Sequence, residues 1–217
     1  MIMEPDFHNS HKLEDEVLYL YLLSKMPNQR LETLQGHKLV FLTKYFAFQK
    51  KEMIFQCKFF MRDKGPVAQH LYDVRDTLNE QSLISITEEP RFKIPAQISN
   101  LTKASQYILE ECENLFLENE WAFAYLKDVA SEYGPIPVKD LRFKVVYKLP
   151  YQNRLIENIP YGTPFDFAIP KTGKVFRLSK DWEETILLLK NPNFKSQMDQ
   201  MFTELKDCTF APFKELQ

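Results

Sequence analysis

The chain has 217 residues, a net charge of −2, 44% hydrophobic residues and 27% charged residues, the composition of an ordinary globular protein of one or two domains. Five glycines argue against glycine-loop nucleotide chemistry, and eighteen phenylalanines and ten tyrosines predict a core of large rings. No uncharged run approaches the ~20 residues that a transmembrane helix needs. Three widely spaced cysteines indicate buried thiols in a reducing compartment, so we predict a soluble, cytoplasmic protein.

Charge is strongly segregated along the chain. Residues 28–65 carry eight cations and three acids, and residues 135–180 carry nine cations and three acids. Between them, residues 104–133 carry seven acids and one lysine. The two basic stretches can bind phosphate locally although the whole chain is close to neutral. The alternative is that these charges lie on solvated helix faces that bind no partner.

Three helices are predicted in the first part of the chain from the spacing of apolar residues, over residues 13–25, 34–48 and 67–80. The third is expected to start at Gly65-Pro66, because glycine adopts turn conformations and proline is well suited to the first turn of a helix. One core is expected to hold six side chains of the second and third helices: Leu39, Leu42, Phe46, Leu71, Val74 and Leu78.

Strands are predicted around these helices. The aromatic stretch 53–61 indicates a strand or an extended connection, and residues 83–87 and 91–94 read as the two strands of a β-hairpin. Helix, helix, helix and hairpin in this order are typical of a winged-helix domain. We therefore predict a winged helix over residues 1–97.

A helical extension is predicted over residues 98–160. It contains helices over 100–114 and 117–131 and a further apolar stretch over 138–149. The aromatic residues of 115–125 are most simply core, and a dimer face is the alternative, since prokaryotic winged helices commonly form two-fold dimers.

A small C-terminal α/β appendage is predicted over residues 161–217. It contains short strands, including one over 174–178, and then a helix over 182–190 for which Ser179 is a good N-cap. A last amphipathic helix is expected over 194–205. The whole chain is thus predicted to be α+β and mostly helical.

A set of mostly apolar motifs resembles the Panacea antitoxin family, the SocA-like, phage-associated winged-helix proteins, and is similar to the YwgA-like prokaryotic winged-helix proteins. The motifs that carry this resemblance are Lys38-Leu39-Val40-Phe41-Leu42, Phe60, Arg62, Gly65-Pro66-Val67, Leu71-Tyr72, Leu78 and Leu83-Ile84, with a weaker continuation at Val146-Tyr147 and Pro150-Tyr151. The resemblance implies a cytoplasmic antitoxin or transcription regulator of prokaryotic type, with DNA or a toxin as its partner. It implies no active site.

A DNA-binding surface is one hypothesis for function. A winged helix on DNA places its third helix in the major groove, where glutamine reads adenine and arginine reads guanine, while lysine and arginine neutralise phosphates. The candidate residues are Lys50, Lys51, Lys58, Arg62, Lys64, Gln69, His70, Arg75, Arg91 and Lys93. Acids on the same helix and a sequence pI near 6.1 argue against this hypothesis.

A partner-binding tail is the second hypothesis. A short strand followed by a capped helix with an aromatic anchor can add a strand to a partner's sheet and place a helix in its groove. The arrangement resembles the toxin-gripping tails of small prokaryotic antitoxins. The candidate residues are Phe176, Leu178, Trp182, Ile186 and Leu189. The alternative is that this strand and helix close the protein's own hydrophobic face.

Catalytic and metal sites are not predicted. His8 and His11 have no further ligand nearby, and Cys57 lies in an aromatic strand where a thiol is usually a packing residue. No P-loop, Rossmann glycines or nucleophile elbow occurs. We therefore predict a non-enzymatic protein without a cofactor that regulates through DNA, a protein partner or both. A protein-interaction module that does not bind DNA is the alternative, and an enzyme of unrecognised type comes third.

Overall fold

The computed structural model describes residues 12–91, 95–168, 172–191 and 193–194. The chain is an α+β protein with 57% helix, 18% strand and several small sheets, so the predicted mostly helical α+β class is confirmed. It divides into two compact units, Met1–Leu178 and Ser179–Gln217.

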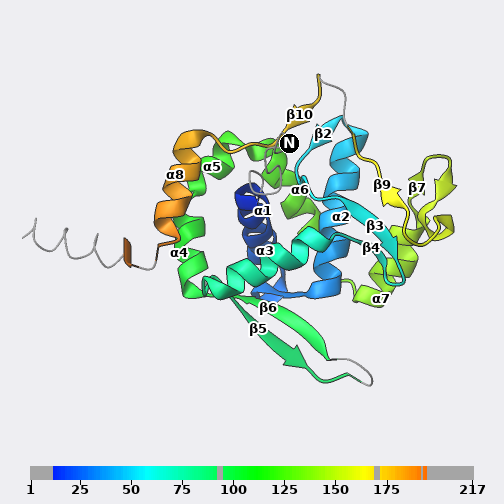
Figure 1. Ribbon diagram of the computed structural model, residues 1–217, viewed down its shortest axis with the longest axis horizontal. Helices are drawn as coiled ribbons and strands as arrows, with labels where there is room; N and C mark the ends of the chain where they lie inside the picture. Colours follow the sequence, from blue (N-terminus) through cyan, green and yellow to red (C-terminus); the bar gives the residue numbers. More distant parts are fainter. Residues whose placement is uncertain (1–11, 92–94, 169–171, 192, 195–217) are drawn as a thin grey trace, which may run out of the picture. The chain divides into compact units, whose positions relative to one another are not determined.

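Two buried helices form the centre of the first unit, α1 (Lys12–Lys25) and α2 (Thr33–Gln49), and α6 (Glu120–Tyr133) packs against both (Figure 1). Leu18, Leu22 and Leu39 have no exposed surface. A helix that carries apolar residues on all of its faces is stable in water only when other elements cover nearly every face, as they do here. The two helices lie within about one residue of the predicted boundaries, and the turn at Met26-Pro27 separates them as expected.

A three-stranded antiparallel sheet follows the helices in the order β1-β6-β5. Its strands are β1 (Arg30–Glu32), β5 (Ile84–Glu89) and β6 (Ala96–Leu101). The predicted hairpin exists, but its second strand was placed too early, because Ile84 pairs with Leu101 and Glu89 with Ala96. Residues 92–94 of the predicted second strand lie outside the described residues. Strand β1 was not predicted, since three residues between two helices leave no alternating pattern to detect.

A second small sheet replaces the predicted start of the third helix. Strands β3 (Phe59–Arg62) and β4 (Gly65–Val67) pair antiparallel, with Met61 opposite Pro66. The prediction that Gly65-Pro66-Val67 starts a helix is therefore wrong. Asp63 and Lys64 form the turn, and Gly65 directly after it has a φ of 88°, which glycine adopts readily. Helix α3 begins only at Gln69 and ends at Glu80.

The helical extension is built as three helices rather than two. They are α4 (Lys103–Glu111), α5 (Glu113–Glu118) and α6 (Glu120–Tyr133). Thr102 caps α4 through a capping box with Ser105, in which each side chain accepts the other residue's backbone N–H. The chain then turns through α7 (Val138–Asp140), one π-helical turn (Leu141–Val145) and one 3₁₀ turn (Val146–Lys148).

Short strands complete the first unit. They are β2 (Glu52–Met53), β7 (Pro150–Tyr151), β8 (Arg154–Leu155), β9 (Pro164–Phe165) and β10 (Lys174–Val175). Strand β9 adds to β3, and β10 pairs in parallel with β2. The predicted strand over 174–178 is thus present in shorter form, and the predicted strand over 53–61 is divided into β2 and β3.

The described part of the second unit is dominated by α8 (Lys180–Leu189). Ser179 caps it as predicted, since its hydroxyl accepts the backbone N–H of Trp182 at 3.3 Å. Leu187 and Leu188 are 58% and 51% exposed. The helix predicted over 194–205 lies almost wholly outside the described residues.

The expected core is largely present. Leu39, Leu42, Leu71, Val74 and Leu78 are buried, and Phe46 is half-buried. We expect Leu71→Ala to lower the free energy of unfolding by ~2–5 kcal/mol, because the cavity on the inner face of α3 cannot fully collapse. Urea denaturation measures this loss, with the exposed α3 change Asn79→Ala as the control. A loss below about 1 kcal/mol would contradict the core assignment.

Candidate protein-interaction groove

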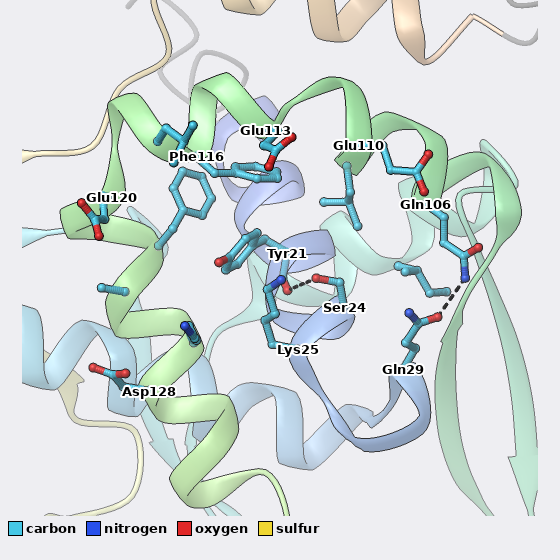
Figure 2. A pocket seen from close by; sticks show the side chains of 16 residues that line it. Tyr21, Ser24, Lys25, Gln29, Gln106, Glu110, Glu113, Phe116, Glu120 and Asp128 are labelled. Carbon is cyan, nitrogen blue, oxygen red and sulfur yellow. Dashed lines mark hydrogen bonds between the residues drawn. The ribbon is translucent and has the colours of Figure 1, made fainter.

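An open groove of about 890 Å³ lies on the first unit between the C-terminal half of α1 and helices α4, α5 and α6 (Figure 2). All of its lining residues belong to this unit. The bend between α4 and α5 at Cys112 and the bend between α5 and α6 at Asn119 carry these helices around one side of α1. The groove therefore forms because the helical segment from α4 to α6 bends at these two residues.

The floor of the groove is aromatic. Tyr21 on α1, Phe116 on α5 and Phe123 on α6 form a cluster with ring centroids 4.6–4.8 Å apart. Leu117 at the edge of this floor is 67% exposed. An apolar floor next to an exposed leucine gives a partner's apolar side chains a place to be buried.

The rim of the groove is acidic. Four carboxylates lie along it, from Glu110, Glu113, Glu120 and Asp128, and all four are exposed. None of them forms a salt bridge with another residue of the described ranges. The cations at the rim are Lys25 and Lys127, so the groove presents an excess of negative charge.

One end of the groove is held by polar contacts. Gln106 Nε2 on α4 donates to Gln29 Oε1 at 2.9 Å, and Ser24 Oγ donates to the Tyr21 carbonyl oxygen at 2.7 Å (Figure 2). The Lys25 ammonium lies 4.7 Å from the centre of the Tyr21 ring. Burial raises the pKa of the Tyr21 phenol above its usual value.

The acidic and aromatic stretches over 104–133 were visible in the sequence, but the groove was not predicted. Phe123 is buried, as a core residue should be, while Phe116 is only half-buried and faces the groove. The groove depends on Tyr21, about a hundred residues away in the chain, which contributes to its floor, and no local pattern indicates this contact.

The predicted guanine-reading residue of α3 is unavailable. Arg75 is 7% exposed, and its guanidinium donates to Asp76 at 2.7 Å, to Thr33 at 2.9 Å and to Gln97 at 2.8 Å. These contacts tie α3 to the start of α2 and to strand β6. The assignment of Arg75 to base recognition is therefore corrected to a structural role.

Two further DNA candidates are also held within the protein. His70 Nε2 lies 3.1 Å from the buried carboxylate of Asp15, and this hydrogen bond raises the pKa of His70. Arg91 donates to both carboxylate oxygens of Glu32, at 2.7 and 3.1 Å. Lys93 lies outside the described residues.

The remaining DNA candidates are exposed. These are Lys50, Lys51, Lys58, Arg62, Lys64 and Gln69. The exposed face of α3, however, also carries Asp73, Asp76 and Glu80. Carboxylates at these positions repel phosphate, so α3 does not present the basic face that major-groove binding requires.

The tail candidates fall into two groups. Phe176 has no exposed surface and packs on Phe123 at 5.6 Å between ring centroids, and Leu178 is 7% exposed. Strand β10 already pairs with β2. Phe176 and Leu178 therefore belong to the protein's own core, and the hypothesis that they bind a partner is corrected. On α8, Ile186 is buried, whereas Trp182 and Leu189 are half-buried.

Metal-binding and membrane-spanning features are the remaining kinds of candidate site. Within the described ranges, no group of three or more His, Cys, Asp and Glu side chains is arranged to hold a metal ion. His8 and His11 lie outside those ranges. No described helix is both long enough and apolar enough to cross a bilayer.

Comparisons with known proteins found no match for this chain among family models, curated proteins or solved structures.

Proposed function

We propose that the first unit contains a winged-helix domain. The elements α1, β1, α2, α3, β5 and β6 occur in the winged-helix order, and β1 pairs with the second strand of the hairpin to give the sheet order β1-β6-β5. In this proposal the β5–β6 hairpin is the wing, which projects from the helices (Figure 1). Strands β2, β3 and β4 form an insertion between the second and third helices.

The function we propose is that of a non-enzymatic regulator or antitoxin-like protein that acts by binding a protein partner. The observation that carries this proposal is the groove, where an aromatic floor and unpaired carboxylates are combined on one surface. The acidic exposed face of α3 favours a protein partner over duplex DNA. The resemblance to the Panacea antitoxins agrees with a protein partner.

The occupant we propose for the groove is a cationic amphipathic helix of the partner. Apolar side chains at helical spacing would be buried on Tyr21, Phe116 and Leu117, and flanking lysines or arginines would face the rim carboxylates. Complementary charge on the rim mainly sets specificity and the association rate.

A synthetic peptide tests this function. The probe is a labelled amphipathic helix with leucine at positions i, i+3, i+4 and i+7 and lysine elsewhere, and fluorescence anisotropy measures its binding. We expect the double variant Glu113→Lys/Glu120→Lys to weaken binding about tenfold or more, since each attraction of about 1 kcal/mol at 4 Å becomes a repulsion.

The matched control has the same change of charge outside the groove, Asp73→Lys/Glu80→Lys on α3, and should weaken binding much less. A peptide with glutamate in place of lysine should bind more weakly than the cationic peptide. If the control variant weakens binding as much as the groove variant, or if both peptides bind equally, the groove is not the binding site. Tighter binding of duplex DNA than of the peptide would favour the DNA alternative.

A further inference from the structure

The fold brings the two basic stretches of the sequence together at the tip of the β3–β4 hairpin. Arg142 Nη1, from the π-helical turn after α7, donates to the Asp63 carbonyl oxygen in that tip at 3.3 Å. A Cβ on Gly65 would lie only 3.2 Å from the Tyr147 ring, which shows how closely the two segments approach. In Figure 1, β3 and β4 end beside α7.

Two exposed rings lie against arginines at this tip. The Arg62 guanidinium lies 5.3 Å from the centre of the Tyr161 ring and donates to its hydroxyl at 3.4 Å, and Tyr161 is 65% exposed. The Arg142 guanidinium lies 4.0 Å from the centre of the Phe143 ring, which is 41% exposed. Phe143 also packs edge-to-face on Tyr147, with 5.4 Å between ring centroids, and both Phe143 and Tyr161 keep ring surface open to solvent.

The cations at the tip are available for a ligand. Arg62 and Lys64 are exposed and Arg142 is half-buried, and among the described residues none of the three has a carboxylate partner. Asp63 is the acid within the hairpin tip itself. The side chain of Lys144, two residues after Arg142, is 74% exposed and forms a salt bridge with Asp140, one turn earlier. The surface thus carries a local positive charge although the protein is close to neutral.

We propose that this surface, formed by Arg62, Lys64, Arg142, Phe143 and Tyr161, binds single-stranded nucleic acid. Cations that track the phosphates and rings that stack on bases are the two elements of such sites. A duplex keeps its bases paired and stacked inside, so the exposed rings would gain nothing from it. The site is separate from the groove and does not depend on the groove's function.

The test uses the full chain, a labelled 15-nucleotide oligothymidylate and a duplex of the same length, with binding measured by anisotropy at 50 and 200 mM salt. We expect the single strand to bind more tightly than the duplex and to weaken as salt rises. Tyr161→Ala and Phe143→Ala should each reduce affinity about five- to a hundredfold, the range for loss of one stacked base. Tyr161→Phe should restore most of the affinity, because it keeps the ring.

Matched controls come from the groove. Leu117→Ala removes a comparably exposed apolar side chain, and Lys127→Gln removes a comparably exposed cation, and both should bind oligothymidylate like the unaltered protein. No binding at 50 mM salt, or equal affinities for single strand and duplex, would overturn the proposal. So would ring variants that bind unchanged, or a polyglutamate peptide that binds as tightly as the oligonucleotide.

Discussion

A chain that lacks residues 161–217 is expected to lose cooperative folding, whereas a chain that lacks only residues 179–217 is expected to keep it. The difference lies in residues 161–178, which carry strands β9 and β10 and three buried phenylalanines. The shorter deletion follows the boundary between the two compact units.

The phenylalanines explain the size of the effect. Phe165 and Phe167 pack on Phe41 of α2 at 4.9 and 5.6 Å between ring centroids, and Phe176 packs on Phe123 of α6. Loss of one buried phenylalanine costs ~3–5 kcal/mol, and a whole domain is stable by only ~5–15 kcal/mol. Removing three at once is therefore expected to exceed the stability of the unit.

Thermal melting followed by circular dichroism distinguishes the two deletions. The chain that ends at Leu178 should show one cooperative transition, and the chain that ends at Pro160 should show none. A cooperative transition in the shorter chain would mean that β9 and β10 are dispensable and would restore the hypothesis that residues from Tyr161 onward form a partner-binding module. Loss of the transition in the longer chain would mean that the second unit is required for the fold.

Much of the helical structure was predictable because it depends on local patterns. The boundaries of α1 and α2, the turn at Met26-Pro27 and the N-cap at Ser179 follow from spacing, proline geometry and a hydroxyl beside free backbone N–H groups. The existence of the β5–β6 hairpin was predictable for the same reason. Its register was not, because several pairings of polar strand ends satisfy the same alternation.

The sequence did not predict the features that depend on contacts between segments far apart in the chain. Gly65-Pro66-Val67 fits a helix start, but this segment forms strand β4, which pairs with β3, and β3 in turn pairs with β9 on its other side. Arg75 occupies a position suited to base recognition, but Thr33 and Gln97 from other elements hold its guanidinium. The groove likewise depends on Tyr21, which belongs to a distant helix.

The contribution of Lys38 to the free energy of unfolding is expected to rise between pH 7 and pH 9. This lysine of α2 is 1% exposed, and its ammonium nitrogen donates to the Pro66 carbonyl oxygen at 2.8 Å. Burial, and secondarily the charge of Arg142, lower the pKa of Lys38 from 10.5 to about 7. The folded state therefore releases the proton near pH 7, whereas the unfolded state keeps it until about 10.5.

Between these two values Lys38 binds more protons in the unfolded chain than in the folded protein. The contribution of Lys38 to stability therefore rises with pH, by at most about 1.4 kcal/mol per pH unit and by about 2 kcal/mol from pH 7 to 9. The thiols of Cys57 and Cys112, whose pKa values burial raises, oppose a smaller part of this rise as the pH approaches 9. His37, whose pKa burial holds at about 3, stays neutral throughout this window. The buried Lys44, whose pKa is also lowered by burial, adds a rise of the same sign.

Replacing Lys38 by methionine keeps the length of the side chain and removes its proton, so Lys38→Met should flatten the rise without abolishing the part due to Lys44. Urea denaturation at pH 7, 8 and 9 measures the free energy of unfolding for both proteins, with the exposed Lys58→Met as a control that should keep the full slope. Parallel curves for the unaltered protein and Lys38→Met would show that Lys38 titrates alike in the folded and unfolded states. Such a result would mean that water reaches its ammonium group, and the tight packing of α2 against β4 would have to be given up.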